Sequence, residues 1–91
     1  MAGETWFLTL GARRIELPAG EHVVGRSRDC DVVVRDATVS RAHALVAVGR
    51  GRVTVQDLGS SNGTLVNGQA VRAETQLAEG DQLRLGRVRM T

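Results

Sequence analysis

Asp57-Leu58-Gly59-Ser60-Ser61-Asn62-Gly63-Thr64 is the stretch on which the fold of this 91-residue chain depends. Apolar residues flank it, with Val53 and Val55 before it and Leu65 and Val66 after it. Its two glycines can adopt backbone angles that other residues avoid. Its hydroxyl and amide side chains can donate and accept hydrogen bonds beside an irregular backbone. The stretch therefore predicts a loop between two strands that either closes on itself or presents these groups to a ligand.

Outward from this loop, short apolar runs alternate with turn residues along the whole chain. Residues 6–10 place Trp6, Leu8 and Leu10 at every second position, which is the period of a strand. Asn67-Gly68 is the strongest hairpin signal, because both central residues of a type I′ turn need positive φ. Similar patterns predict strands over residues 6–10, 13–17, 22–26, 32–34, 42–48, 52–56, 65–66, 69–71, 82–85 and 88–90. This pattern indicates an all-β sandwich.

Two segments are less clear from their residues alone. Residues 42–48 form a longer apolar run, which predicts a strand that could be buried on both faces. Residues 72–79 contain Ala, Glu, Gln and Leu, which would suit a short helix by propensity.

Composition indicates a single domain of ordinary globular character. Hydrophobic residues make up 42% of the chain and charged residues 24%. No apolar run approaches the roughly 18 residues needed to cross a bilayer, and the first residues lack the pattern of a secretory signal. A single cysteine, Cys30, excludes an intramolecular disulfide framework and fits a reducing compartment. We therefore expect a cytoplasmic location and no membrane partner.

All 12 basic residues are arginine, and the net charge is +2. The absence of lysine excludes Schiff-base chemistry and a Walker-type phosphate loop, which ends in Gly-Lys-Ser/Thr. Arginine suits a planar, bidentate grip on phosphate or carboxylate.

Two further stretches, Gly25-Arg26 and Ser40-Arg41-Ala42-His43, place arginines and a hydroxyl on separate loops that could converge with the first. Together these motifs, in this order, resemble the forkhead-associated (FHA) domain over roughly residues 5–90. The motifs that carry the resemblance are Gly25-Arg26, residues 40–43, residues 60–64, Asn67-Gly68, Gly80-Asp81 and Leu85-Gly86.

The resemblance implies an FHA-like β-sandwich of about eleven short strands in two sheets. It makes residues 1–91 a single FHA-like domain with its core at about residues 5–90, and we expect it to be part of a larger protein. It also favours a loop or short strand over a helix at residues 72–79, since tertiary context routinely overrides propensity.

The resemblance further implies a phosphothreonine-dependent peptide-binding module. The residues that match the family's ligand-contacting positions are Arg26, Ser40, Arg41, Ser61 and Asn62. Arg26 would contact the phosphopeptide, Ser40 and Ser61 would approach the phosphate, and Asn62 would hold the peptide main chain. From spacing alone, Arg26 could equally be a solvated arginine at a strand end and Ser40 a cap between loop and strand.

Four other residues match positions that shape the loops. These are Gly25, His43, Gly63 and Asn67. The resemblance implies that His43 braces the binding loops by hydrogen bonds rather than acting as a catalytic base. The implied partner is a phosphothreonine-containing protein or peptide in Ser/Thr kinase signalling, either a kinase or its substrate, and no cofactor is expected.

Alternative functions remain open at this point. Ser40, His43 and Asp57 are the residue types of a hydrolase triad, but no Gly-x-Ser-x-Gly elbow presents a nucleophile, and we expect no enzyme. Asp29 and Asp31 do not continue with the spacing of a calcium loop, so no metal site is expected.

A binder of nucleic acid is the alternative that composition suggests. The arginines that could form a basic patch are Arg50, Arg52, Arg84, Arg87 and Arg89. The chain has almost no aromatic residues to stack on bases, which weighs against this reading. A protein interaction module that does not need phosphate is the other alternative.

Overall fold

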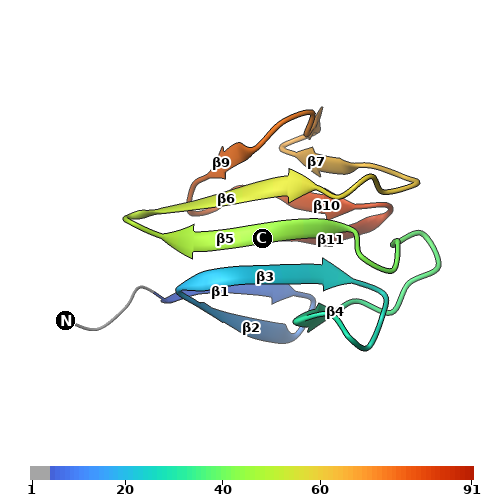
Figure 1. Cartoon of the computed structure of the whole chain (residues 1–91), viewed down its shortest axis with the longest axis horizontal. Helices are drawn as coiled ribbons and strands as arrows, with labels where there is room; N and C mark the ends of the chain where they lie inside the picture. The colour runs from blue at the N-terminus through green and yellow to red at the C-terminus, as the bar shows by residue number, and fades with distance from the viewer. Residues whose placement is uncertain (1–4) are drawn as a thin grey trace.

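The computed structural model describes residues 5–91, which form eleven β-strands and no helix (Figure 1). Over these residues, therefore, no helix is long and apolar enough to span a bilayer. The strands are β1 Thr5–Leu10, β2 Arg13–Pro18, β3 Gly20–Gly25, β4 Val32–Val33, β5 Ala44–Gly49, β6 Arg52–Asp57, β7 Thr64–Val66, β8 Gln69–Ala70, β9 Thr75–Leu77, β10 Leu83–Leu85 and β11 Val88–Met90.

The strands are arranged in two layers. One layer is a five-stranded sheet in the order β4-β3-β5-β6-β9, antiparallel except for the parallel pair β3–β4. The other layer contains the four strands β11-β10-β7-β8 and the hairpin β1-β2. Reciprocal backbone hydrogen bonds of 2.8 and 3.0 Å between Thr9 and Thr91 join β1 to the end of β11. The predicted two-layer sandwich of eleven strands is confirmed.

The core between the layers is built almost entirely from aliphatic side chains. Strict alternation along the strands directs one side chain in two inward. The fully buried residues of the core include Val24, Val39, Ala44, Val46, Val55, Leu83, Leu85 and Met90. Phe7 points outward instead, is 44% exposed, and carries the Arg14 guanidinium 3.9 Å above its ring centre.

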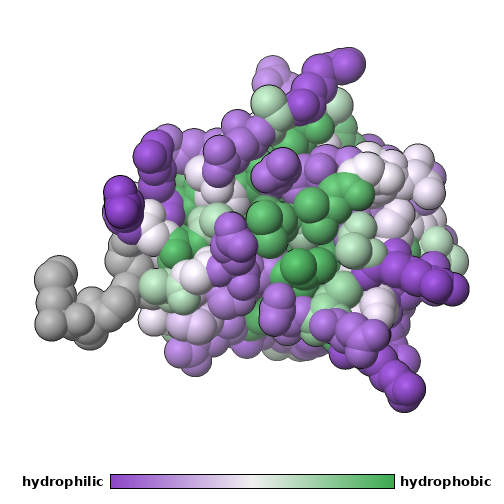
Figure 2. Space-filling model, viewed as in Figure 1, coloured by the Kyte–Doolittle hydropathy of each residue, from purple (hydrophilic) through white to green (hydrophobic). Residues whose placement is uncertain are grey.

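The expectation that residues 42–48 are buried on both faces is wrong in part. Along β5, Ala44, Val46 and Val48 are buried, whereas Leu45 and Ala47 are only half-buried. The reason is that the five-stranded sheet is an outer layer, with nothing packed on its second face among residues 5–91. Figure 2 shows hydrophobic side chains on this outer face, over β3 and β5.

Turn chemistry sets the registers of the hairpins. Asn67 and Gly68 have φ values of 50° and 84°, which confirms the type I′ turn predicted between β7 and β8. Residues 72–79 contain the short strand β9, which pairs with β6, so the expectation of a loop or short strand is confirmed. The β6–β9 ladder supplies the tertiary context that overrides helix propensity there.

Strand register brings three loops to one end of the sandwich. Val24 near the end of β3 pairs with Ala44 at the start of β5, and Ala44 pairs with Asp57 at the end of β6. The loops that leave or enter these strands, residues 26–31, 34–43 and 58–63, therefore lie side by side at the right of Figure 1.

Candidate functional site

The first two loops of the site are paired through their backbones. The N–H of Arg26 donates to the carbonyl of Ser40 at 2.9 Å, and the N–H of Ser27 donates to the carbonyl of Arg41 at 3.2 Å. Gly25 permits this approach, because a Cβ at that position would overlap the Arg41 carbonyl oxygen. The Cys30 thiol also donates to that oxygen at 2.9 Å, and burial raises the pKa of the thiol.

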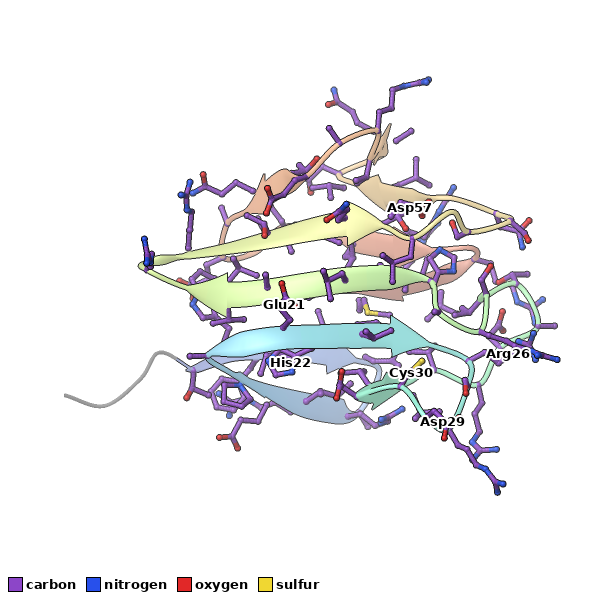
Figure 3. All side chains as sticks on the ribbon, in the orientation of Figure 1. Glu21, His22, Arg26, Asp29, Cys30 and Asp57 are labelled. Atoms are coloured by element: carbon purple, nitrogen blue, oxygen red, sulfur yellow. The ribbon has the colours of Figure 1, made fainter. Side chains whose placement is uncertain are left out.

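Arg26 is oriented before any ligand arrives. Its side chain extends from the end of β3 at the loop end of the molecule (Figure 3). Its Nε donates to the Val39 carbonyl at 2.9 Å, which fixes the plane of the guanidinium. Among residues 5–91 neither terminal nitrogen of Arg26 has a partner, so the fork stays available for an anion.

Ser40 and Ser61 meet directly, although they are on different loops. The Ser61 N–H donates to the Ser40 Oγ at 3.0 Å. The Ser40 hydroxyl hydrogen, the Ser61 hydroxyl and the exposed Arg41 guanidinium find no partner within the described part of the chain. The structure therefore brings Ser61 directly to Ser40, whose carbonyl in turn accepts the N–H of Arg26, so the three loops of the site meet at Ser40.

The His43 ring is buried between the loops, with none of its surface exposed. Its Nδ1 accepts the N–H of Ser40 at 3.0 Å, so the proton of the neutral ring lies on Nε2. Nε2 then donates to the carbonyl of Gly63 at 2.9 Å. One ring thus holds Ser40, in the loop of residues 34–43, against Gly63, in the loop of residues 58–63. His43 itself is not in a strand, contrary to the sequence prediction, but is the last residue before β5.

The Asp57 carboxylate organises the third loop. It accepts the Ser60 and Thr64 hydroxyls at 2.6 Å each and the N–H groups of Gly59 and Ser60 at 3.0 Å. Partial burial by itself raises the pKa of this carboxyl, but these hydrogen bonds outweigh burial and hold the pKa below its usual value. Asp57 was not among the predicted site residues. The Asp-x-x-Ser spacing, typical of a side chain that caps its own turn, was the signal for it.

The side chain of Asn62 is held in place by residues that were not predicted from the sequence as part of the site. Its amide Nδ2 donates to the carbonyl of Thr38 at 2.8 Å, and its Oδ1 has no partner among residues 5–91. The Thr38 hydroxyl donates to Asp36 and accepts the N–H of Arg87 at 3.0 Å. Arg87 Nε in turn donates to Asp36 Oδ1 at 3.0 Å. The turn between β10 and β11 is thereby locked to the loop beneath Asn62.

Gly86 is the point of closest approach in this lock. Its N–H donates to the carbonyl of Gly63 at 3.1 Å, and a Cβ on it would overlap the Thr38 carbonyl oxygen. Gly63 itself has a φ of 85°. Its carbonyl accepts two hydrogen bonds, one from this N–H and one from Nε2 of His43.

Asn67 does not join this cluster. It lies at the other end of β7, where its Nδ2 donates to Asp81 at 3.0 Å and its Oδ1 accepts the Gln82 N–H at 2.9 Å. The Ala78 N–H also donates to Asp81, at 2.8 Å, and this bond, followed by the one from the Asn67 amide, holds the pKa of the Asp81 carboxyl below its usual value. Asn67 therefore braces the turn between β7 and β8 against the loop that precedes β10.

The residues of the alternative functions are arranged differently. Both ring nitrogens of His43 are occupied by Ser40 N–H and Gly63 C=O, so the ring does not reach Asp57, and no triad is formed. Over residues 5–91, no group of three His, Cys, Asp or Glu side chains is placed to hold a metal. Arg87 is paired with Asp36, whereas Arg84 and Arg89 face each other across β10 and β11.

Replacing the His43 ring should separate the two loops. We expect His43→Ala to lower the free energy of unfolding by about 2–5 kcal/mol, because it leaves a cavity and two backbone groups without partners. Amide exchange of the Ser40 N–H should accelerate in the variant beyond the change in other loop amides. His22→Ala is the matched control, since that histidine bonds only Pro18 on the far part of the sheet. Unchanged Ser40 protection would contradict the bridging role.

Acid should remove the contribution of Asp57. Because the pKa of this carboxyl is lower in the folded chain than the value of about 3.9 in an unfolded one, its stabilisation is present above about pH 4 and is lost as the pH falls through the folded pKa. Asp57→Asn should cost about 1–3 kcal/mol at pH 7, and the difference from wild type should shrink below pH 4. Urea denaturation from pH 7 to pH 2.5 measures this. The prediction would be contradicted if the difference in free energy of unfolding between the two proteins were the same at every pH. Asp29→Asn, on an exposed loop, is the control.

Comparison with known proteins adds to this geometry. The family model for the FHA domain matches residues 22–86. A curated relative, the glycogen accumulation regulator GarA of Mycolicibacterium smegmatis, is 42% identical over 66 residues, which are 72% of this chain and 41% of GarA. The chain thus spans less than half of the length of this relative.

Solved structures give the same result. A structure from work on phosphothreonine-dependent FHA domain interactions superposes with a TM-score of 0.88 at 34% identity, covering 96% of this chain and 93% of the other. EmbR of Mycobacterium tuberculosis, solved with a low-affinity phosphopeptide, superposes with a TM-score of 0.90 at 31% identity, covering 96% of this chain and 24% of EmbR. With the family model matching most of its length, this chain belongs to the FHA domain family.

Proposed function

We propose that this domain binds phosphothreonine-containing peptides through the surface formed by Arg26, Ser40, Arg41, Ser61 and Asn62. The observation that carries the proposal is that three adjoining loops carry hydrogen-bond donors without partners in the described chain. Other polar groups of the same loops are bonded to one another and hold the loops in place. The proposal is supported by membership of the FHA family and by the structural similarity to part of EmbR, which was solved in complex with a phosphopeptide.

The donors match the chemistry of a phosphate. A phosphothreonine brings about −1.5 to −2 charges at pH 7 and three acceptor oxygens. Arg26 offers a guanidinium with both terminal nitrogens free. Ser40 offers a hydroxyl hydrogen, and its Oγ is held 3.0 Å from the backbone nitrogen of Ser61. Arg41 adds a second exposed cation. Hydrogen bonds of this kind, with one or both partners charged, are the strong ones.

Asn62 would hold the peptide backbone beside the phosphothreonine. Because its Nδ2 is bonded to the Thr38 carbonyl, the orientation of the amide is fixed, and Oδ1 has no partner among the described residues. An acceptor oriented in this way suits the N–H of an extended peptide. Gly25, His43 and Gly63 would act through the loops, and Asn67 through the fold rather than the ligand.

The finer points of the function follow from this assignment. The domain would act as a non-enzymatic module within a larger protein, and its partner would be a Ser/Thr kinase or a kinase substrate in the cytoplasm. Two alternatives remain as outcomes of experiment: a module that binds its partner without phosphate, and a basic surface that follows a nucleic-acid backbone. The second would lose affinity steeply with added salt, whereas a site for one phosphate would lose it mildly.

The arginine fork should be the anchor of binding. We expect Arg26→Ala and Ser40→Ala each to weaken phosphopeptide binding by about 1–3 kcal/mol, because each removes hydrogen bonds to a charged group. Arg26→Lys should recover only part of the loss, since an ammonium cannot reproduce the planar fork. Calorimetric titration measures this, with Arg52→Ala at the opposite end of β6 as a control for the loss of one charge. Wild-type affinity in a folded Arg26→Ala protein would retire the assignment.

Affinity should also order four peptides that differ only at the central residue. Phosphothreonine should bind best and phosphoserine next, because burying one more methyl group contributes roughly 0.8 kcal/mol. Glutamate, with one charge on a flat carboxylate, should follow, and unmodified threonine should be last. Fluorescence titration gives the order. Equal binding of the phosphorylated and unmodified threonine peptides would support the phosphate-independent alternative instead.

A further inference from the structure

A groove of about 460 Å³ lies at the edge of the sandwich, between β4 and the turn that joins β1 to β2. We call it the Arg13 groove, after one of the two arginines that line it. In Figure 1, β4 and this turn lie below β3, toward the end of the sandwich that carries the three loops. The floor of the groove is apolar and consists of buried or half-buried side chains, which are Leu10, Val33, Val34 and Val88.

Arg13 reaches the groove from the inner face of β2. Residues two apart on a strand share a face, and Leu17, on the same face as Arg13, belongs to the core. The Nη1 of Arg13 donates to the carbonyl of Val33 at 3.3 Å, on the edge of β4 that does not pair with β3. The other N–H groups of this guanidinium have no partner among residues 5–91. The bond to Val33 therefore positions the guanidinium and leaves donors over.

The positive charge of the groove is not balanced. Arg35 is exposed and has no partner in the described part of the chain. Asp36 is the one carboxylate of the lining, but its Oδ1 is already paired with Arg87 at 3.0 Å. Its Oδ2 accepts the N–H and the hydroxyl of Thr38, and these bonds, the hydroxyl first, hold the pKa of the Asp36 carboxyl below its usual value. Two arginine charges thus lie beside an apolar floor without a counter-charge.

The groove adjoins the surface proposed for the phosphopeptide. The segment from Asp36 to Ser40 connects the two, and four residues of extended chain span at most about 14 Å. Midway along this segment, the Thr38 carbonyl accepts the amide of Asn62. A peptide held at Ser40 by its phosphothreonine would therefore bring residues a few positions away within reach of the groove.

The groove is bounded by internal segments of the chain, residues 10–13, 33–36 and 88. β1 runs from Thr5 toward the groove at Leu10. β11 runs from Val88 to Thr91, which is paired antiparallel with Thr9 by reciprocal hydrogen bonds. At Thr91 the chain is therefore directed back along β1, away from the groove.

We propose that the Arg13 groove binds an acidic and apolar segment of the same partner that presents the phosphothreonine. Carboxylates of this segment would pair with Arg13 and Arg35, because planar guanidinium groups suit carboxylates, and an apolar side chain between them would lie on the floor. The inference rests on the proposed function, since the phosphothreonine is the anchor. An exposed ion pair alone contributes little, but a tethered second contact acts at high effective concentration. The groove would thus select acidic partners among phosphothreonine proteins.

An unphosphorylated peptide tests the groove by itself. Acetyl-Glu-Val-Glu-Val-Glu-amide, titrated into the 91-residue chain and followed by amide NMR, should give saturable shifts at Val33, Arg35 and Val88, with a Kd on the order of 10⁻³ M. The same peptide with Gln in place of Glu should give none. The shifts should persist in Arg26→Ala, because Arg26 lies outside the groove.

Phosphothreonine peptides test the link to the partner. Two peptides carry Glu-Val-Glu three residues before or three residues after the phosphothreonine, and two matched peptides carry Gln-Val-Gln there. One of the acidic peptides, set by the direction in which the peptide lies, should bind about three- to tenfold more tightly than its Gln counterpart in calorimetric titration.

Protein variants assign this gain to the groove. Arg13→Gln combined with Arg35→Gln should abolish it and leave the affinity for the Gln peptides within about twofold. Arg35→Gln alone, which removes no hydrogen bond among residues 5–91, should remove part of it. Arg14→Gln combined with Arg52→Gln is the matched control with the same loss of charge. It should keep the gain, because Arg14 lies over Phe7 on the other face of β2 and Arg52 begins β6 at the far end from the loops.

The inference and the proposed function fail separately. If no phosphothreonine peptide binds, the proposed function is wrong, and the unphosphorylated peptide still decides whether the groove binds acidic segments. The absence of saturable shifts at the groove, or an equal loss of the gain in the control pair, would overturn the inference. Shifts at the groove without a gain for either acidic phosphopeptide would overturn the assignment of both sites to one partner.

Discussion

The hydrogen bonds of the buried His43 ring are the interactions on which the binding end of this molecule depends. The ring is an acceptor for the loop that ends at Ser40 and a donor for the loop that ends at Gly63. Both partners are backbone groups, so they fix the paths of the loops and leave the loop side chains free. The ring itself sits where β5 begins, with its backbone N–H on the Val24 carbonyl of β3 and its carbonyl on Leu58 N–H. His43 therefore links the positions of these two loops to the position of the core sheet.

Around this bridge the polar groups divide into those used by the scaffold and those left for a ligand. Asp57 is saturated by the loop that it organises, and the Asp36–Thr38–Arg87 set is saturated between two loops. The terminal nitrogens of Arg26 and the Ser40 hydroxyl hydrogen are left over. A site whose loops are already held in place loses little conformational entropy on binding, and this leaves more of the contact energy for affinity. The depressed pKa of Asp57 follows from the same saturation.

Sequence alone predicted the strands well, because alternation and turn residues are local signals, as Asn67-Gly68 illustrates. It failed at the outer face of β5, since a sequence does not reveal which face of a sheet lacks a second layer. The converging loops were predicted through the family resemblance. The contacts that hold Asn62 in place were not predicted from the sequence. Asp36 and Arg87 are 51 residues apart, and their contact depends on the packing of the β10–β11 turn. Whether the five predicted contact residues bind phosphothreonine stays a prediction.

The two ends of the sandwich differ in the interactions that hold their elements together. At the loop end, closure comes from hydrogen bonds between backbone groups and short side chains, which are directional and leave oriented polar groups over. At the end near Trp6, the contacts are mainly those of aliphatic side chains, which are not directional. Hydrogen bonds therefore orient polar groups at the loop end, whereas aliphatic contacts add stability without orienting any polar group. The continuous sheet of β3, β5 and β6 connects the two ends, so the aliphatic core that this sheet helps to form also fixes the strand ends from which the loops extend.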